Sequence, residues 1–362
     1  MIVKKTLVAP LDWGLGHATR CIPIVQELLR KEHEVLIAAD GNGEHILREE
    51  FPELQFINLK GYHLKYSKHI PVWLKIFLQL PKIFSAIRRE HAALKKIIDE
   101  HNIDLVISDN RFGLWNKKVK TVYITHQVMI KCPAGLKFFE PFLYSLHKRI
   151  IRKFDNCWIP DYGGENNLSG DLSHKYKIPP NAEFIGPLSR FGAAKQQVIE
   201  NDLCIILSGP EPVRTAFEKK IFGMLENYTG KSIVILGRPG QKHPEVKSGI
   251  KIFSHLKTDA LEKAILSSRF VICRSGYSSI MDLVALKKNA LLIPTPGQTE
   301  QEYLGKYLSS RNIFQSQEQK NFSLIDLAAE NFSVEKIFEE EDRLREAIDK
   351  LIPEKKESYV PA

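Results

Sequence analysis

The sequence predicts an α/β protein made of two doubly wound, Rossmann-like domains, and three observations support this fold class. Short apolar runs alternate with longer helical patterns along the whole chain, which is typical of parallel sheets joined by right-handed helical crossovers. At 362 residues the chain exceeds what one hydrophobic core usually organises. A stretch rich in Gly, Pro and polar residues at 185–201 separates the two halves. We therefore expect domains at 1–187 and 188–332, followed by an amphipathic helix and tail at 333–362.

The expected elements follow from these runs in chain order. In the first half the predicted strands are Lys4–Pro10, Glu34–Ala39, Asp104–Ser108 and Thr121–Thr125, and the predicted helices include Ala18–Lys31 and Gly43–Glu50. In the second half the predicted strands are Leu203–Ser208, Ser232–Gly237, Lys251–Phe253, Phe270–Cys273 and Ala290–Pro294. Ser333–Leu351 is predicted to be a helix that either lies on the surface or crosses back to the first domain. Because ligands bind at the carboxyl ends of strands in open α/β sheets, we expect the two domains to face a central cleft.

Composition limits the class of protein. Apolar residues make up 43% and charged residues 26% of the chain, as in a soluble globular protein. No apolar run approaches the length of about 18 residues that a membrane span needs, and the N-terminal run is too short for a signal peptide, so we expect a cytoplasmic location. The five cysteines are dispersed, which argues against a disulfide framework or a zinc site. The net charge of +9 favours an anionic partner: nucleic acid, a membrane surface or nucleotide phosphates.

The segment 270–284 is the most informative in the chain. It combines an apolar strand, a turn containing Arg274, Ser275 and Gly276, and a helix that starts with serines and includes Ser279 and Asp282. A helix N-terminus has unpaired N–H groups and a partial positive charge, so this arrangement suits a phosphate. Asp282 could accept hydrogen bonds from sugar hydroxyls. A second loop, after the strand 290–294, contains Glu300 and Gln301, and together the two loops predict a sugar-nucleotide site.

The loop after the first strand is the other candidate for chemistry. Gly14 and Gly16 allow a tight turn there, and His17 lies at the expected start of the next helix. A histidine has an ordinary pKa near neutrality, so His17 is a plausible general base for a hydroxyl, or alternatively a residue that caps or positions the helix. Arg20 is expected either to pair with a phosphate or to be solvated.

These motifs resemble the GT-B glycosyltransferases. Gly14–Leu15–Gly16–His17, Arg274–Ser275–Gly276 with Ser279 and Asp282, and Gln301 carry the resemblance, and the second half is most similar to family 28, which includes the peptidoglycan lipid-intermediate N-acetylglucosaminyltransferases. The resemblance implies that the arginine–glycine turn holds the nucleotide diphosphate, that Asp282 binds ribose, and that Gln301 contacts the donor sugar. It also implies that backbone near Phe253 meets the uracil.

The chain departs from that family at three places. The glycine-rich turn after the first strand of the second domain is replaced here by Ser208–Pro212, in which Ser208 and Gly209 stay candidate nucleotide ligands but Glu211 would repel phosphate. Leu304 stands where an asparagine often follows the glutamine motif. The sequence Gly-x-Gly-His-x-x-Arg-Cys resembles instead the UDP-sugar hydrolases of pseudaminic acid synthesis.

The chain contains no Asp-x-Asp motif, so we expect no metal and no cofactor besides the UDP-sugar substrate. The leaving UDP would then be stabilised by a helix N-terminus, by Ser275 and Ser279, and by cations such as Arg238 or Arg274. Asp109, at the end of a strand, is a rival base or the group that orients one. The residues expected to contact the acceptor are Arg20, His126 and Gln127.

Two segments of the first domain, 69–90 and 137–154, are both apolar and basic. Such helices suit an anionic membrane surface and would fit a lipid-linked acceptor, although they could simply pack on the sheet with solvated lysines. Pro81 is expected to kink or divide the first of them.

The sequence therefore predicts a glycosyltransferase that moves a sugar from a UDP-sugar to a hydroxyl acceptor, by an inverting and metal-independent reaction. The alternatives are a nucleotide-sugar hydrolase in which His17 activates water, a nucleotide-sugar epimerase, and a non-catalytic UDP-sugar-binding or membrane-associated scaffold. Nucleic acid is not an expected partner, because no recognised nucleic-acid module is present.

Overall fold

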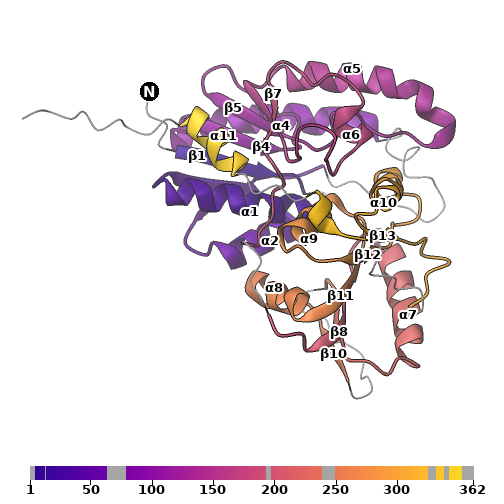
Figure 1. Ribbon diagram of the computed structural model, residues 1–362. Coiled ribbons are helices and arrows are strands. Elements are labelled where there is room, and N and C mark those ends of the chain that lie inside the picture. Colours follow the sequence, from indigo (N-terminus) through magenta and orange to yellow (C-terminus); the bar gives the residue numbers. More distant parts are fainter. Residues whose placement is uncertain are drawn as a thin grey trace, which may run out of the picture.

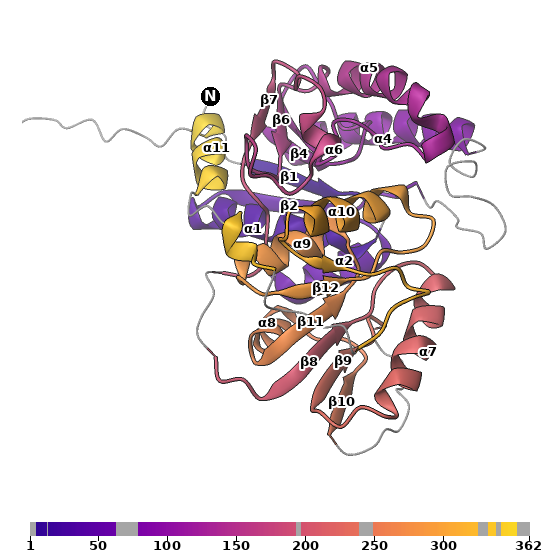
Figure 2. The ribbon, with the colours of Figure 1, turned by 45° about the vertical axis from the view of Figure 1, so that its right-hand side comes forward.

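The computed structural model describes residues 5–12, 14–62, 79–192, 197–238, 249–324, 332–337 and 342–352. These residues form two α/β units, the first drawn above the second in Figure 1. Each unit is built on a parallel sheet, and helices α9 and α10 lie at the junction between the units (Figure 2). The predicted fold class is therefore confirmed.

The first sheet has seven parallel strands in the order β3-β2-β1-β4-β5-β6-β7. Its strands are β1 Lys5–Pro10, β2 Glu34–Ala39, β3 Gln55–Asn58, β4 Leu105–Asp109, β5 Lys120–Ile124, β6 Asn156–Ile159 and β7 Ala182–Phe184. Its helices are α1 Leu15–Arg30, α2 Gly41–Glu50, α4 Leu80–His101, the short helix η1 Ala134–Phe139, α5 Glu140–Ile151 and α6 Asp171–His174. Pro10, Asp109 and Ile124 are aligned across β1, β4 and β5, so the residues that follow these strands share one edge of the sheet.

The second sheet has six parallel strands in the order β10-β9-β8-β11-β12-β13, which is the order of a doubly wound fold. Its strands are β8 Asn201–Ile206, β9 Ser232–Ile235, β10 Ile250–Phe253, β11 Ser268–Cys273, β12 Ala290–Leu292 and β13 Gln315–Ser316. Its helices are α7 Val213–Leu225, α8 Thr258–Leu266, α9 Tyr277–Ala285 and α10 Thr299–Ser310. The sheet changes between β7 and β8, and the predicted domain boundary at 187/188 lies in this linker.

A continuous apolar cluster joins the two units. It includes Val8 and Ile22 from the first unit and Tyr277, Ile280 and Leu304 from the second. The central strands of both sheets are buried on both faces, which is why their sequences are continuous apolar runs and not alternating ones. This shared core holds the carboxyl ends of the two sets of strands against one another.

Several local predictions needed correction. The short strands β3, β6, β7 and β13 were not predicted, and their few residues lack a long apolar run. Pro81 lies in the first turn of α4, where an N–H is not needed, so the described helix starts next to this proline. The part of the expected helix 69–90 that precedes residue 79 lies outside the described residues. None of the helices in the described part of the chain is long and apolar enough to span a membrane.

The C-terminal segment is not the single helix expected over 333–351. A short 3-10 turn, η3 Val334–Lys336, comes first, and helix α11 Arg343–Leu351 starts separately with Asp342 as its N-cap. Helix α11 packs on the first unit beside α1 (Figure 2), where Lys350 Nζ lies 2.9 Å from Glu183 Oε2. The chain therefore crosses back to the first domain, as one of the two predicted alternatives had it.

A buried ion pair ties α4 to the carboxyl edge of the first sheet. Arg111, just past β4, donates from Nε to Glu90 Oε1 at 2.7 Å and from Nη2 to the carbonyls of Leu59 and Lys60. Tyr62 donates its hydroxyl to the other Glu90 oxygen at 2.9 Å. These bonds fix the loops behind the site.

Candidate active site

The site forms where the N-terminal ends of α1, α9 and α10 come together at the domain junction. Ser278, in the first turn of α9, donates its hydroxyl to the Gly16 carbonyl at 2.9 Å. A Cβ added to Gly16 would lie 2.6 Å from Ser278 Oγ and 3.2 Å from its Cβ, so a larger residue would displace the Ser278 side chain from this bond. Gly14 has a φ of +84° at the start of α1, a conformation that glycine adopts without strain. The glycines of the first loop thus serve turn geometry and domain contact.

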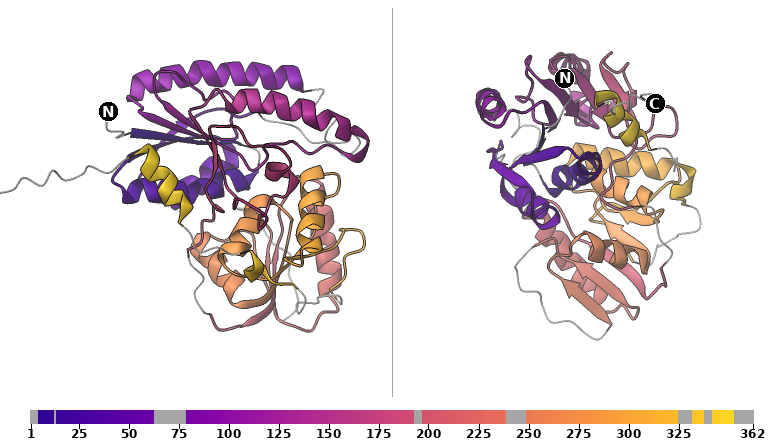
Figure 3. Two further views of the ribbon diagram at one scale, coloured as in Figure 1. Left: turned by 45° about the horizontal axis from the view of Figure 1, so that its top comes forward. Right: turned by 90° about the vertical axis from the view of Figure 1, so that its left-hand side faces the viewer.

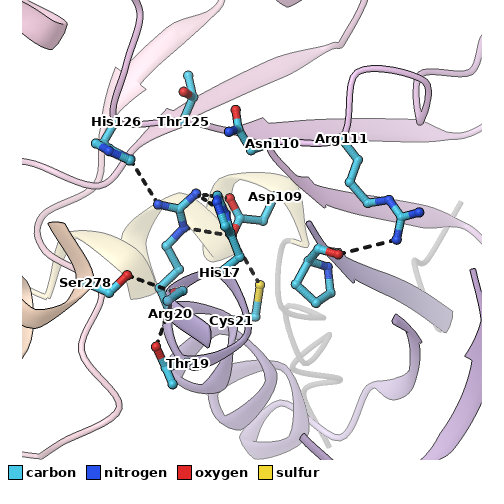
Figure 4. A network of polar contacts seen from close by, with 12 residues as sticks. His17, Thr19, Arg20, Cys21, Asp109, Asn110, Arg111, Thr125, His126 and Ser278 are labelled. Carbon is cyan, nitrogen blue, oxygen red and sulfur yellow. Dashed lines mark hydrogen bonds and ion pairs between the residues drawn. The ribbon is translucent and has the colours of Figure 1, made fainter. Parts of the chain in front are cut away.

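His17, in the first turn of α1, contacts Asp109 at the end of β4 (Figure 4). His17 Nδ1 lies 3.1 Å from Asp109 Oδ2 and 2.8 Å from Arg20 Nη2. Arg20 also holds Asp109 through both carboxylate oxygens, with its Nε 2.7 Å from Oδ2. The Asp109 side chain is fully buried and the His17 side chain is 13% exposed. The structure therefore brings together the two residues predicted as base and orienting group.

The charges of this group fix its protonation at neutral pH. Burial would raise the pKa of Asp109, but Arg20 and His17 outweigh it and lower that pKa to about 2. Burial, and next the charge of Arg20, lower the pKa of His17 below its ordinary value, although Asp109 acts in the opposite direction. At neutral pH Asp109 is therefore ionised and His17 is neutral, which is the state a general base requires.

The predicted acceptor residues connect the two domains. Arg20 donates from Nη1 to His126 Nδ1 at 3.0 Å, and His126 Nε2 lies 2.7 Å from Glu300 Oε1 in α10. Gln127 donates its amide to the second Glu300 oxygen. Arg20 thus binds His126, and both His126 and Gln127 bind the second domain through Glu300. Their contact with an acceptor stays a prediction.

The predicted donor loops do come together at the start of α9. Ser275 donates its hydroxyl to the Gln301 carbonyl at 2.8 Å. The Thr295 N–H donates to Gln301 Oε1 at 2.9 Å, so the side-chain amide nitrogen of Gln301 turns toward Gly276, 3.9 Å from where a Cβ would lie. The Ser279 hydroxyl lies beside the same position, 4.0 Å away. This region offers hydroxyl and amide donors beside a helix N-terminus.

Arg274 is buried within the second domain. Its guanidinium is buried against the ring of Phe217 and donates to the carbonyls of Ile293 and Pro294 and to Gln319 Oε1. Burial lowers its pKa to about 10. The guanidinium holds the loops of the second domain together, and its Nε lies 4.0 Å from where a Cβ of Gly209 would be. Its contact with a diphosphate stays a prediction.

Asp282 contacts the linker between the domains. Ser189 donates its hydroxyl to Asp282 Oδ1 at 2.8 Å, and Arg190 Nε lies 3.5 Å from Oδ2. Burial raises the pKa of Asp282, an effect that Arg190 and Ser189 partly offset. Ser189 and Arg190 were missed because nothing in a Gly- and Pro-rich linker marks a residue that returns to a distant helix of the next domain.

The loop after β8 contains the carboxylate of Glu211. Glu211 accepts hydrogen bonds from the Thr215 N–H and hydroxyl and from Arg214 Nε. Arg238 lies 3.1 Å from Glu218 Oε2 and 3.5 Å from Glu211 Oε1, so this predicted phosphate ligand is engaged within its own domain.

The remaining predicted ligands of this loop lie nearby. Ser208 is half-buried and Gly209 is exposed at the same edge of the sheet. Phe253 ends the edge strand β10, and its carbonyl accepts from the Leu236 N–H.

Tyr277 and Ser278, also missed, carry the contacts of α9 with the first domain. The ring of Tyr277 stacks on His126 with centroids 4.2 Å apart, and its hydroxyl donates to the Pro160 carbonyl at 2.9 Å. The only signal in the sequence was the position of these residues, directly after the glycine turn.

Comparisons with known proteins agree with this fold. Residues 11–127 match the model of glycosyl transferase family 1, and residues 239–360 match the model of the glycosyltransferase family 28 C-terminal domain. An uncharacterized glycosyltransferase of Methanosarcina acetivorans is 24% identical over 328 residues, which cover 82% of this chain and 79% of the relative.

Solved structures share the fold at low identity. The glycosyltransferase SnogD from Streptomyces nogalater gives a TM-score of 0.66 at 13% identity, covering 97% of this chain and 99% of SnogD. MurG of Acinetobacter baumannii gives a TM-score of 0.54 at 11% identity, covering 96% and 99%.

The two facing Rossmann-like domains and the matched family models define this chain as a glycosyltransferase of the GT-B fold. Residues 239–360 are similar to the family 28 C-terminal domain, the family that the sequence motifs resemble.

Proposed function

We propose that this glycosyltransferase transfers a sugar from a UDP-sugar to a hydroxyl acceptor, with His17 as the general base. The observation that carries the proposal is the pairing of a neutral, slightly exposed His17 with the ionised Asp109, next to the start of α9 and its donors. A base and an anion-binding helix N-terminus on opposite sides of one junction are what transfer from a nucleotide sugar requires.

Nδ1 of His17 has two neighbours that favour different tautomers. A proton on Nδ1 donates to Asp109 and leaves the Nε2 lone pair to accept the proton of a substrate hydroxyl. The other tautomer accepts from Arg20 and carries its proton on Nε2. A hydroxyl that donates to Nε2 selects the first tautomer, so acceptor binding itself would prepare the base. Direct attack by that hydroxyl on the sugar would invert the configuration at the anomeric carbon.

The start of α9 supports a diphosphate site. The N-terminus of α9 has a partial positive charge, and Ser279 and the Gln301 amide lie beside it. Arg190 adds a cation next to Asp282, the proposed ribose ligand. The Asp109 and Glu300 carboxylates at the junction are already engaged by Arg20, His126 and Gln127, which supports transfer without a metal ion.

We also propose that the first domain docks on an anionic membrane, where it would meet a lipid-linked acceptor. Helices α4 and α5 lie side by side on the outside of this domain (Figure 3). Phe138 is 71% and Phe142 65% exposed, an unusual exposure for aromatic side chains. Exposed basic residues of the same segment are Lys137, Arg149, Arg152 and Lys153.

Sedimentation with phosphatidylglycerol vesicles, compared with phosphatidylcholine vesicles, tests the docking. Phe142→Glu should abolish binding to the anionic vesicles while leaving donor turnover in solution unchanged. Equal sedimentation of the wild type with both kinds of vesicle, or none with either, would contradict a basic membrane-docking face.

The donor is tested by calorimetry with UDP, GDP, ADP, dTDP and a set of UDP-sugars, in the presence and absence of a chelator. The thymidine nucleotide is included because the spinosyn rhamnosyltransferase SpnG, a structure of similar fold, is complexed with thymidine diphosphate. Selective binding of UDP that survives the chelator supports the proposal. Binding of dTDP in preference to UDP, or only with a divalent metal, would contradict it.

A further inference from the structure

Glu300 sits at the domain junction in an unexpected role. It lies in the first turn of α10, in the second domain, yet its two carboxylate oxygens are bound by side chains of the first domain. His126 Nε2 is 2.7 Å from Oε1, and the Gln127 amide donates to Oε2. Gln301, its neighbour in the sequence, instead turns its amide to the start of α9. The two adjacent residues, both predicted as donor ligands, thus face different partners.

The direction of the hydrogen bonds through His126 is fixed by chemistry. The guanidinium of Arg20 only donates, so His126 Nδ1, 3.0 Å from Nη1, must accept. The proton of the neutral ring is then on Nε2, from which it donates to Glu300. The ring is also held in plane by Tyr277, at an interplanar angle of 6°. Two residues of the second domain therefore orient the His126 ring. Tyr277 stacks on its face, and Glu300 accepts the hydrogen bond from Nε2.

The chain of bonds continues to the base. Arg20 holds both oxygens of Asp109, and Asp109 Oδ2 lies 3.1 Å from His17 Nδ1. Glu300 and His17 thus stand at the two ends of one series of contacts: Glu300, His126, Arg20, Asp109, His17. Burial would raise the pKa of Glu300, but the His126 contact and the Arg20 charge lower it, so Glu300 is anionic and attracts these donors.

We propose that Glu300 and His126 are positioning residues that couple domain closure to the orientation of the base. This inference rests on the proposed role of His17. The coupling has a physical basis because Arg20 contacts His126 and Asp109 with the same rigid guanidinium. If the second domain moves away, His126 loses both its hydrogen-bond partner Glu300 and the stacked ring of Tyr277, and Arg20 loses an acceptor of fixed orientation. His17 is then correctly oriented only when the domains are closed around the donor.

The test compares substitutions at the two residues with a control in the same helix. Glu300→Ala removes the acceptor for His126, whereas Glu300→Gln keeps an oxygen that accepts from Nε2. His126→Asn keeps an oxygen acceptor near the position of Nδ1 but removes the ring Nε2–H that donates to Glu300. The matched control is Glu302→Ala, an exposed residue whose side chain accepts only from the Gly297 N–H among the described residues.

We expect Glu300→Ala and His126→Asn each to lower kcat about 10- to 100-fold, the cost of a misplaced catalytic group, with the donor KM and the UDP Kd unchanged. Glu300→Gln should restore most of kcat, the double variant should be no slower than the slower single variant, and Glu302→Ala should match the wild type. A raised donor KM with wild-type kcat in Glu300→Ala would overturn the proposal, because it identifies a sugar ligand.

A second readout does not depend on turnover. In protein labelled with ¹⁵N-histidine, NMR should find Nδ1 of His126 unprotonated, and Glu300→Ala should shift the His17 ring signals while Glu302→Ala does not. A proton on Nδ1 of His126, or His17 ring signals that are unchanged in Glu300→Ala, would refute the coupling. This result does not depend on whether the donor is a UDP-sugar. If the NMR results are as expected but neither the wild type nor any variant transfers a sugar, the proposed function is contradicted and the coupling is not.

Discussion

Replacement of Asp109 by asparagine tests how the base is held. The asparagine would keep one oxygen acceptor for two donors, Arg20 and His17, both of which now contact the carboxylate. The Arg20 side chain is 2% exposed, and leaving a buried charge unpaired costs about 3–5 kcal/mol, so the remaining oxygen should stay with Arg20. His17 then loses its acceptor and its tautomer.

We therefore expect Asp109→Asn to lower kcat by about 10²–10⁴-fold, the usual contribution of a general base, which corresponds to about 3–5 kcal/mol of barrier. The UDP Kd should be unchanged, because Asp109 lies in the first domain beneath the base. Initial rates of UDP release and calorimetry with UDP measure the two quantities.

The matched control is Asp155→Asn in the same domain. Asp155 accepts from the N–H and hydroxyl of Thr121 at the amino-terminal edge of the same sheet, opposite the site. The Asp155→Asn variant should keep the wild-type kcat even if urea denaturation shows that its free energy of unfolding is lower. A kcat for Asp109→Asn close to that of the wild type would refute the argument that Asp109 orients the base.

Three further predictions concern the same junction. The acid limb of the kcat/KM profile should report the pKa of His17, which burial and Arg20 lower: activity should be constant at neutral pH and fall only below pH 6.5, and an acid limb above the ordinary value of 6.5 would contradict this. Gly16→Ala should push α1 from α9, because the new Cβ would lie 2.6 Å from Ser278 Oγ; we expect a loss of about 1–3 kcal/mol in the free energy of unfolding, measured in urea, and an unchanged midpoint would show that the contact is loose. Asp282→Asn should weaken UDP binding about tenfold or more if the carboxylate accepts from ribose, and an unchanged calorimetric Kd would remove that assignment.

The sequence was informative where a strand leads through glycine into a helix. The apolar runs that became β1 and β11 and the turns at Gly14 and Gly276 located the two loops that meet at the junction. His17 and Asp109 were found because Asp109 ends β4 and His17 lies in the first turn of the helix that follows β1, and the carboxyl ends of these two parallel strands share an edge of the sheet. Position in a βα unit was therefore enough to select two residues, His17 and Asp109, that the structure places in contact.

The direction of a side chain past a strand end could not be predicted. Arg274 and Ser275 are adjacent, yet the first lies against Phe217 in the core of the second domain and the second faces α10. Successive residues of an extended chain point to opposite sides, and a shift of one residue in the strand end exchanges them. A motif names both residues without saying which one faces the ligand.

Contacts between the domains were also beyond the sequence. The bond from Ser278 to Gly16 joins residues 262 positions apart, and that from His126 to Glu300 joins residues 174 apart. No local periodicity records such pairs, because they depend on how two separately folded sheets are placed. The contacts of His126 and Gln127 with the neighbouring domain were for this reason not predicted.

Donor turnover by the wild type and by His17→Ala is the decisive measurement, made as UDP release from the UDP-sugar that binds, with and without hydroxyl acceptors. We predict acceptor-dependent release by the wild type, a loss of about 10²–10⁴-fold in His17→Ala, and the same UDP Kd for both proteins. Equal turnover by the two proteins would contradict His17 as the base, and release that no acceptor increases would identify hydrolysis in place of transfer.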